Sequence, residues 1–257
     1  MAKIKDVIEI IEKFAPLNLQ ADFDNCGLKI GNIEQELTGV LVTLDTNLDV
    51  VKEAIEKKCN LIIEHHPLIF HAIKKIDSSY PQMQAAMLAI KNDIAVYSAH
   101  TNVDFCDGGL NDYVAEQIGL TEIEKIDGAD SPRIGVLKSE KTLGEFAEEL
   151  GNIFHDGNFS TIGDKGKKIK RVAVVNGGGG SSDDDLILAM EAGADVFVTG
   201  DVKYNVARLA KDANYAIIQI GHYNSEQGFK PLMAKMLSSE IKENYIHQAT
   251  SLLNPYN

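Results

Sequence analysis

The sequence is poor in cysteine and in basic residues. Its three cysteines are widely spaced over 257 residues and form no C-x-x-C motif, which excludes a disulfide framework and a thiolate zinc site and is typical of reduced thiols. Lys and Arg number 25 against 38 Asp and Glu, so the formal net charge is −13. This excess of negative charge argues against a broad basic face that would bind duplex nucleic acid or anionic lipid. We therefore expect neither nucleic acid nor a membrane among its partners.

Long apolar runs are also absent. No run approaches the ~20 residues that a membrane span requires. The first residues lack a signal peptide's apolar block and instead place Ile4, Val7, Ile8 and Ile11 at helical spacing. We therefore expect a soluble, cytoplasmic protein. A hydrophobic content of 44% with 25% charged residues is ordinary for a globular chain of one large or two small domains.

Runs that predict buried strands alternate with segments of helical periodicity in both halves of the chain. The predicted strands cover residues 39–44, 61–63, 94–97, 171–175, 195–198 and 216–220. The predicted helices between them cover residues 47–58, 82–91, 184–192 and 206–213. Strands separated by helices of this length imply right-handed crossovers and mostly parallel pairing.

The alternation predicts an α/β fold made of two structurally similar units with mostly parallel sheets. We expect residues 1–127 to form the first unit, with residues 227–257 packing back on it, and residues 128–226 to form the second. The stretch between the halves is less regular. It contains one amphipathic helix, predicted over 142–154, and a hairpin or loop over 156–170.

Histidines follow the predicted strands. His65 and His66 come directly after the strand at 61–63, where an α/β sheet presents its ligand-binding edge. Adjacent residues at a strand end point to opposite sides, so the pair can address two metal ions, or one ion and a substrate. The alternative is two surface imidazoles beside the turn-forming Pro67. For the remaining histidines, His71, His155 and His247, we expect surface or supporting positions.

A histidine lies four residues before a carboxylate in each half: His100 with Asp104, and His222 with Glu226. Imidazole with carboxylate suits zinc, iron, manganese or nickel. Taken singly, each pair is as readily a surface hydrogen bond or a core contact. Together, every cluster follows a predicted strand, and a set of three histidines and two carboxylates matches a two-metal centre for hydrolysis. A single ion would need fewer ligands, so we predict two ions at the interface of the two units.

The tetraglycine Gly177–Gly180 lies between a predicted strand and a predicted helix, the position of a phosphate-cradling loop. No Lys-Ser/Thr follows it, and its spacing is not G-x-G-x-x-G. The sequence therefore favours a tight turn before a helix capped by Ser182 and Asp185. The alternative is a flexible loop over the metal pocket.

Five segments, in order and spanning nearly the whole chain, resemble the GTP cyclohydrolase 1 type 2 homologue family, also called NIF-three-like proteins. They are residues 22–31 (DFDNCGLKIG), 64–70 (EHHPLIF), 98–104 (SAHTNVD), 199–204 (TGDVKY) and 221–226 (GHYNSE). Phe23 stands where the family usually has Trp, a packing change that we expect to leave Asp24 and Asn25 in position.

The resemblance implies two divalent metal ions per subunit, with His100 as a neighbour of the pocket. The implied ligands are His65, His66, Asp104, His222 and Glu226. It also implies a toroidal homohexamer of two-domain α/β subunits, with the metal sites facing an inner cavity. The ligand types accept zinc, iron, manganese or nickel and do not select among them.

The family's label implies a metal-dependent hydrolase in which a metal-activated water attacks a small molecule, such as a nucleotide or pterin-like substrate. His100 or Glu226 would then move protons. Two alternatives remain open at this point. One is a metal chaperone or scaffold, and the other is a regulatory interaction protein without turnover.

Overall fold

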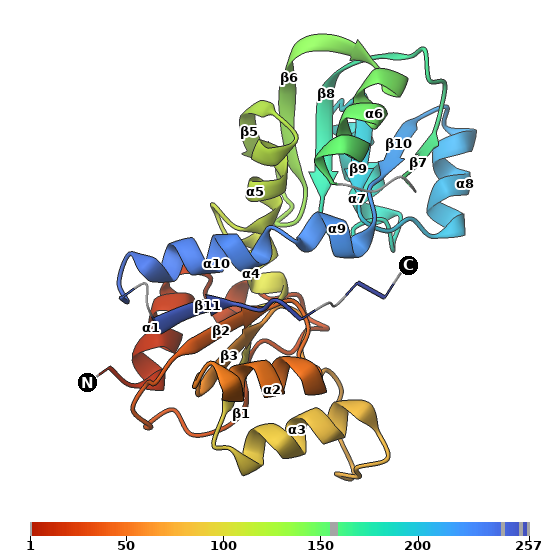
Figure 1. Ribbon diagram of the computed structural model, residues 1–257. Helices are drawn as coiled ribbons and strands as arrows, with labels where there is room; N and C mark the ends of the chain where they lie inside the picture. The colour runs from red at the N-terminus through yellow and green to blue at the C-terminus, as the bar shows by residue number, and fades with distance from the viewer. Residues whose placement is uncertain (1, 155–158, 243–244, 252–253, 256–257) are drawn as a thin grey trace. The chain divides into compact units, whose positions relative to one another are not determined.

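The computed structural model describes residues 2–154, 159–242, 245–251 and 254–255, which form two compact units (Figure 1). One unit consists of Met1–Cys106 together with Phe229–Asn257, and the other of Asp107–Gly228. Residues 107–127, expected from the sequence to belong to the first unit, group with the second in this division. Helix α5 (Leu110–Gln117) packs there against β5 (Leu120–Lys125), β6 (Arg133–Thr142) and β8 (Lys168–Val175).

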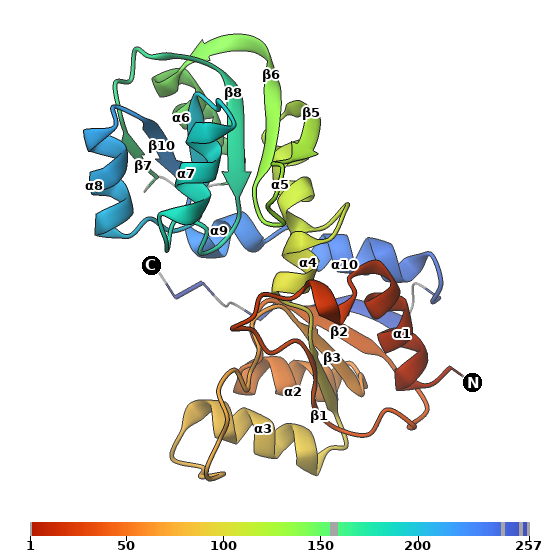
Figure 2. The same cartoon turned by 180° about the vertical axis from the view of Figure 1, so that it is seen from behind.

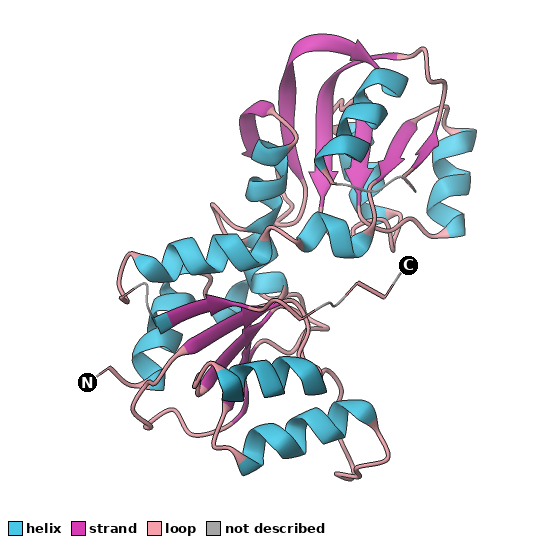
Figure 3. Cartoon of the chain, viewed as in Figure 1, coloured by secondary structure: helices cyan, strands magenta, loops and turns pink. Residues whose placement is uncertain are grey.

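The first unit is a five-stranded sheet with helices on both faces (Figures 1 and 3). The strand order is β1 (Gly27–Ile30), β4 (Ala95–Ser98), β3 (Leu61–Glu64), β2 (Val40–Thr43) and β11 (Ile246–Gln248). Only the β1–β4 pair is antiparallel. The mostly parallel sheet predicted for this unit is therefore confirmed.

Helices α2 (Leu48–Glu56) and α3 (Pro81–Lys91) cover one face of this sheet, and α1 (Ile4–Phe14) and α10 (Phe229–Ser238) lie on the opposite side (Figures 1 and 2). The four apolar residues predicted to form the buried stripe of α1 are all buried. Helix α2 begins where the sequence indicates, because Asn47 Oδ1 accepts hydrogen bonds from the amides of Asp49 at 3.0 Å and Val50 at 2.9 Å.

The register aligns the carboxyl ends of three strands in the first unit. Thr43 pairs with Glu64, and Glu64 pairs with Ser98, the last residues of β2, β3 and β4. Whatever follows these strands must therefore lie along one edge of the sheet. The residues that follow include the predicted site histidines.

Glu53 on helix α2 holds the C-terminal segment of the first unit in place. Its carboxylate accepts hydrogen bonds from the amide and hydroxyl of Thr250 at 2.9 and 3.0 Å, and from those of Ser251 at 2.9 and 2.7 Å. Burial alone would raise the pKa of Glu53, but these hydrogen bonds outweigh it and hold the pKa at about 2.

Replacing Glu53 by Ala should lower the free energy of unfolding of the first unit by about 2 kcal/mol, because four donors lose a charged acceptor. Since the pKa is depressed in the folded state, the carboxylate stabilises fully above the ordinary value of 4.5 and loses its effect as the pH falls toward 2. Urea unfolding at pH 7 and pH 3 measures both effects. Glu56→Ala, an exposed neighbour on α2, is the control and should change stability by less than about 0.5 kcal/mol.

The second unit is a six-stranded sheet that is mixed, which corrects the prediction of mostly parallel pairing there. Its order is β5, β6, β8, β9 (Val196–Thr199), β10 (Ala216–Gln219) and β7 (Ser160–Ile162). Only β8, β9 and β10 run parallel to one another, whereas β5–β6, β6–β8 and β10–β7 are antiparallel. The irregular middle of the chain supplies the antiparallel strands. The hairpin or loop predicted over 156–170 contains β7 and the start of β8, and its first residues lie outside the described ranges.

Helices again cover both faces of the second sheet. Helix α5 and α6 (Leu143–Ile153) pack on one face, and α7 (Asp184–Glu191) and α8 (Tyr204–Asp212) on the other. Helix α6 confirms the amphipathic helix predicted over 142–154. The predicted capping box at α7 is wrong: its N-cap is Asp183, which makes no side-chain capping bond, and the Ser182 hydroxyl donates instead to the Asp184 carboxylate at 3.1 Å.

The three parallel strands of the second unit also end together, since Val175 and Gln219 both pair with Thr199. The segments that follow them are the tetraglycine, Gly200-Asp201 and Gly221-His222. No helix within the described ranges is long and apolar enough to cross a bilayer.

Candidate functional site

Three histidines of the first unit come together at the edge where β3 and β4 end. His65, His66 and His100 each offer a ring nitrogen, and these nitrogens all lie within 4.8 Å of one another. The ring centroids of His100 lie 5.1 Å from His65 and 5.7 Å from His66. Asp104, on the short helix α4 (Thr101–Phe105), places Oδ1 3.8 Å from His65 Nε2. We refer to these four residues as the His65 cluster.

The strand pattern predicts that His65 and His66 point to opposite sides of the sheet. In the structure they do not. Strand β3 ends at Glu64, and the amides of both histidines donate to the carbonyl of Leu44, at 3.0 and 2.9 Å. This bend ends the alternation of the strand, so the two ring centroids are only 5.0 Å apart. Both rings can therefore address one region of space.

Each histidine of the His65 cluster has its Nδ1 atom beside an oxygen. The oxygens belong to Ala99 (carbonyl, 3.0 Å from His65), Asp45 (3.0 Å from His66) and Asp24 (2.8 Å from His100). Carbonyls and carboxylates only accept hydrogen bonds, so Nδ1 must carry the proton in each ring. Nε2 is consequently the atom that bears the lone pair when these imidazoles are neutral.

Asp24 is the most connected of these acceptors. Its side chain is fully buried, and besides His100 it accepts from the amides of Asn25 at 2.6 Å and Thr101 at 3.0 Å, and from the Thr101 hydroxyl. Burial opposes its charge, but the hydrogen bonds and the attraction to His100 hold the pKa of Asp24 well below its usual range. Phe23 is exposed, and these contacts of Asp24 and Asn25 do not involve its ring.

Glu64 supports the cluster from inside the sheet. It is fully buried, and its Oε1 accepts from the amide of Leu68 at 2.8 Å and from the hydroxyl of Ser98 at 2.7 Å. These bonds join the turn after His66 to the end of β4. Burial raises the pKa of Glu64 to about 7.

The second unit carries a smaller cluster on α9 (His222–Glu226). His222 and Glu226 lie one turn apart, with Nε2 3.2 Å from Glu226 Oε1 and Nδ1 2.7 Å from Asp201 Oδ2. Burial would lower the pKa of His222, but the hydrogen bonds and charges of Glu226 and Asp201 raise it to about 9. We refer to His222, Glu226 and Asp201 as the His222 cluster.

Asp24, Asp45 and Asp201 lie at the Nδ1 atoms of these histidines, a role that the sequence did not predict for them. Asp45 follows strand β2 and Asp201 follows β9, so both occupy the same kind of strand-end position as the histidines. This position after a strand was the signal in the sequence that could have identified them. Which carboxylate meets which ring depends on the register of the sheet, which local sequence does not reveal.

The tetraglycine loop lies against the His222 cluster. Gly177 has a φ of +56°, and a Cβ there would enter the space of Glu226 Oε1 and lie 3.3 Å from His222 Nε2. The loop is anchored, because the Gly177 amide donates to Ser225 Oγ at 2.9 Å and its carbonyl accepts from the Asp201 amide at 2.8 Å. Glycine is thus required here for close approach.

The other histidines of the described ranges do not belong to these clusters. His71 is exposed, His247 is half-buried in β11, and His155 lies outside the described residues. Cys26 is partly buried, and burial raises its pKa to about 12, so its thiol is not an activated nucleophile.

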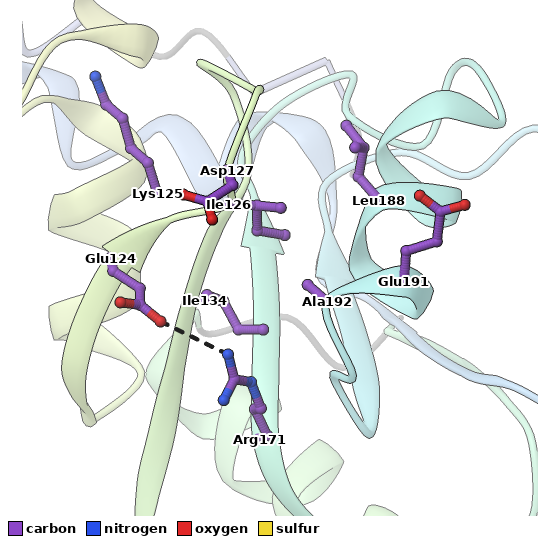
Figure 4. Close-up of a pocket in the computed structure, with 9 residues that line it drawn as sticks. All are labelled: Glu124, Lys125, Ile126, Asp127, Ile134, Arg171, Leu188, Glu191 and Ala192. Atoms are coloured by element: carbon purple, nitrogen blue, oxygen red, sulfur yellow. Dashed lines mark ion pairs between the residues drawn. The ribbon is translucent and has the colours of Figure 1, made fainter.

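A pocket of about 370 Å³ lies elsewhere in the second unit, between the β5–β6 end and α7 (Figure 4). Its floor is apolar, with Ile126, Ile134 and Leu188, and its rim carries charges of both signs. Arg171 is ion-paired with Glu124 at 3.6 Å. The pocket contains no histidine and none of the predicted site residues, so the two histidine clusters remain the candidate site.

The structure thus defines a class: a mixed α/β protein whose two sheets gather histidines and carboxylates where parallel strands end. The model of the Duf34/NIF3 (NGG1p interacting factor 3) family matches residues 2–253. The chain belongs to this family, and the resemblance stated from the motifs is confirmed.

Relatives in sequence and structure agree with this assignment. A protein of Clostridium acetobutylicum named GTP cyclohydrolase 1 type 2 homolog is 35% identical over 246 residues, covering 93% of this chain and 91% of that protein. The protein of the same name from Clostridium perfringens is 37% identical over 94% of this chain and 92% of its own length. The crystal structure of a Bacillus cereus protein related to NIF3 superposes with a TM-score of 0.91 at 25% identity, covering 100% of this chain and 99% of that one.

Proposed function

We propose that the protein binds two divalent metal ions and uses them to hydrolyse a small molecule. The ligands would be His65, His66, Asp104, His222 and Glu226. The observation that carries this proposal is the set of Nδ1 contacts described above. In both clusters, an acceptor oxygen lies at Nδ1 of each histidine.

This donor set fits a metal better than it fits ordinary packing. Metal-ligating histidines almost always donate one ring N–H to a carboxylate or carbonyl, which orients the ring and makes the other nitrogen more basic. Here Asp45 and Asp201 supply such carboxylates to His66 and His222, and Ala99 supplies a carbonyl to His65. Mixed imidazole and carboxylate ligands suit zinc, iron, manganese or nickel.

Two such ions would acidify bound water and neutralise charge that develops on substrate oxygens. The chain's own groups would position and move protons. His100 is held at Nδ1 by the buried Asp24, and one of its ring nitrogens lies within 4.8 Å of those of His65 and His66. Glu226 lies beside His222. Each is a candidate to carry a proton to or from a substrate.

We propose a nucleotide or pterin-like substrate on the family resemblance, and relatives carry the name GTP cyclohydrolase 1 type 2 homolog. The tetraglycine loop does not by itself select a phosphate, since three aspartates, 183–185, follow it closely. On the basis of the family resemblance, we also propose that the protein is a cytoplasmic homohexamer. Light scattering of the purified protein measures its oligomeric state.

Metal analysis of the purified protein tests the central proposal. The protein is stripped with a chelator, reloaded separately with zinc, iron(II), manganese and nickel, and assayed by mass spectrometry for bound metal. We expect at least one of the four metals to bind at two equivalents per chain. The protein loaded with that metal should turn over a substrate in a screen of nucleotides, pterins and phosphoesters. Failure to retain any of the four ions would contradict the proposal. Tight binding without turnover would favour a metal chaperone or scaffold.

A further inference from the structure

The outer edge of the first unit's sheet carries a groove that contains none of the proposed metal ligands. Strand β11 is the edge strand, with β2 on one side of it and no strand of the described ranges on the other (Figure 1). The groove has a volume of about 510 Å³ and is lined by all three residues of β11, by α10 and by Lys57 at the end of α2. We propose that this groove binds an extended acidic peptide, which adds to the sheet as a further strand next to β11.

The first step is the direction of the backbone groups of β11. The Ala249 amide donates to the carbonyl of Val42 at 2.8 Å, and Gln248 is the residue that pairs with Val42 in the parallel ladder. Successive residues of a strand turn their N–H and C=O groups to opposite sides. The backbone groups of Ile246 and Gln248 therefore face away from β2. An added strand can form main-chain hydrogen bonds with both residues, which is how extended peptides bind at the edges of sheets.

The second step is the difference between the two faces of β11. His247 pairs with Leu41, whose side chain packs in the core that α2 covers. Paired residues of neighbouring strands share a face, so the imidazole of His247 lies on the side of α2, the helix that ends at Lys57. Ile246 points to the opposite face, that of α10, where Ala234 also lines the groove. The groove thus offers basic groups on one face of the edge and an apolar wall on the other.

The third step is the charge of the groove. Lys57, Lys235 and His247 line it, and no acidic side chain of the described residues does, although the whole chain has 38 acidic residues against 25 lysines and arginines. Lys57 lies 3.7 Å from Glu53, whose carboxylate also holds the C-terminal segment, whereas Lys235 is exposed. The same basic groove on a second copy of the chain would be repelled. Charge complementarity therefore selects an acidic strand from a different partner.

The experiment measures the binding of short synthetic peptides to the full chain by fluorescence anisotropy. One peptide alternates glutamate with valine, so that an extended chain presents glutamates to Lys57 and His247 and valines to the wall formed by α10. The other alternates lysine with valine. We expect the glutamate peptide to bind, and to bind more weakly as the salt concentration rises, and we expect the lysine peptide not to bind. No detectable binding of the glutamate peptide at about 1 mM would overturn the proposal.

Two methylated forms of the glutamate peptide test the main-chain pairing. One carries N-methyl groups on its glutamate amides, and the other carries them on its valine amides. Because only alternate amides of an added strand face its neighbour, one form should keep the affinity of the parent peptide. The other should bind at least about tenfold more weakly, since its hydrogen bonds to β11 are lost. Equal affinities of the two forms would mean that the groove binds acidic groups by charge alone, and would overturn strand addition.

Variants of the chain locate the binding. Lys235→Glu should weaken binding of the glutamate peptide at least about fivefold. Lys91→Glu is the matched control, because Lys91 is also exposed in the last turn of a helix but does not line the groove. Gln248→Pro deletes an amide that faces away from β2, so it should weaken binding at least about fivefold while β11 stays paired. Melting temperatures of the variants report on folding. Equal peptide affinities of Lys235→Glu and Lys91→Glu would place the peptide elsewhere and overturn the proposal.

Discussion

Glu226→Gln should abolish the proposed turnover and remove one of the two proposed metal ions. The side chain of Glu226 is 3% exposed and its Oε1 lies 3.2 Å from His222 Nε2, so an amide of nearly equal shape fits but carries no charge for a cation. Loss of a charged ligand should cost at least about a hundredfold in affinity for that ion. The measurement is bound metal per chain together with turnover of whichever substrate the screen identifies. Glu148→Gln, an exposed glutamate on α6, should retain both ions and full activity.

The same substitution should change how His222 titrates in the metal-free protein. Glu226 and Asp201 raise the pKa of His222 to about 9 from its ordinary 6.5, and removing one of the two charges should lower it. Because the raised pKa belongs to the folded state, the contribution to stability is complete below pH 6.5 and is lost as the pH rises through 9. Metal must displace this proton, so affinity at the His222 cluster should rise with pH up to about 9. Histidine NMR titration would contradict this account if His222 titrated alike in wild type and Glu226→Gln.

Local signals in the sequence were sufficient to predict most of the parallel strands and the helices between them. Strand β3 and helix α2 follow from a short apolar run and from an Asn47 cap, both of which act within a few residues. Strand β6 was not predicted, because three of its residues 138–141 are charged and its burial pattern does not alternate cleanly. The mixed pairing of the second sheet depends on partners far apart in the chain, which local periodicity does not contain.

The candidate site shows the same division between local and long-range information. Aligned strand ends gather His65, His66 and His100 in one unit, and that alignment follows from parallel pairing alone. The direction of His66 was mispredicted because the bend after β3 depends on Leu44 in another segment. The acceptors Asp24, Asp45 and Asp201 needed three-dimensional structure, since an aspartate beside a strand end is usually only a solvated charge.

Gly177→Ala should remove the ion at the His222 cluster while costing only modest stability. A methyl group at Gly177 would occupy the space of Glu226 Oε1, the far end of a flexible side chain, so Glu226 rather than the backbone would move. The φ of +56° adds a backbone penalty of roughly 1–2 kcal/mol for alanine. We therefore expect a small fall in melting temperature and a loss of one bound ion comparable to that of Glu226→Gln.

A second glycine separates crowding from backbone strain. Gly193 has a φ of +74°, but a Cβ there would meet nothing within 4 Å. Gly193→Ala should therefore show a similar fall in melting temperature and keep both ions, because the same backbone penalty applies without displacing a ligand. Equal ion content in the two alanine variants would show that the loop does not set the position of Glu226. A loss confined to Gly177→Ala would mean that the tetraglycine is there for close approach to the His222 cluster, a role distinct from phosphate binding and from a simple turn.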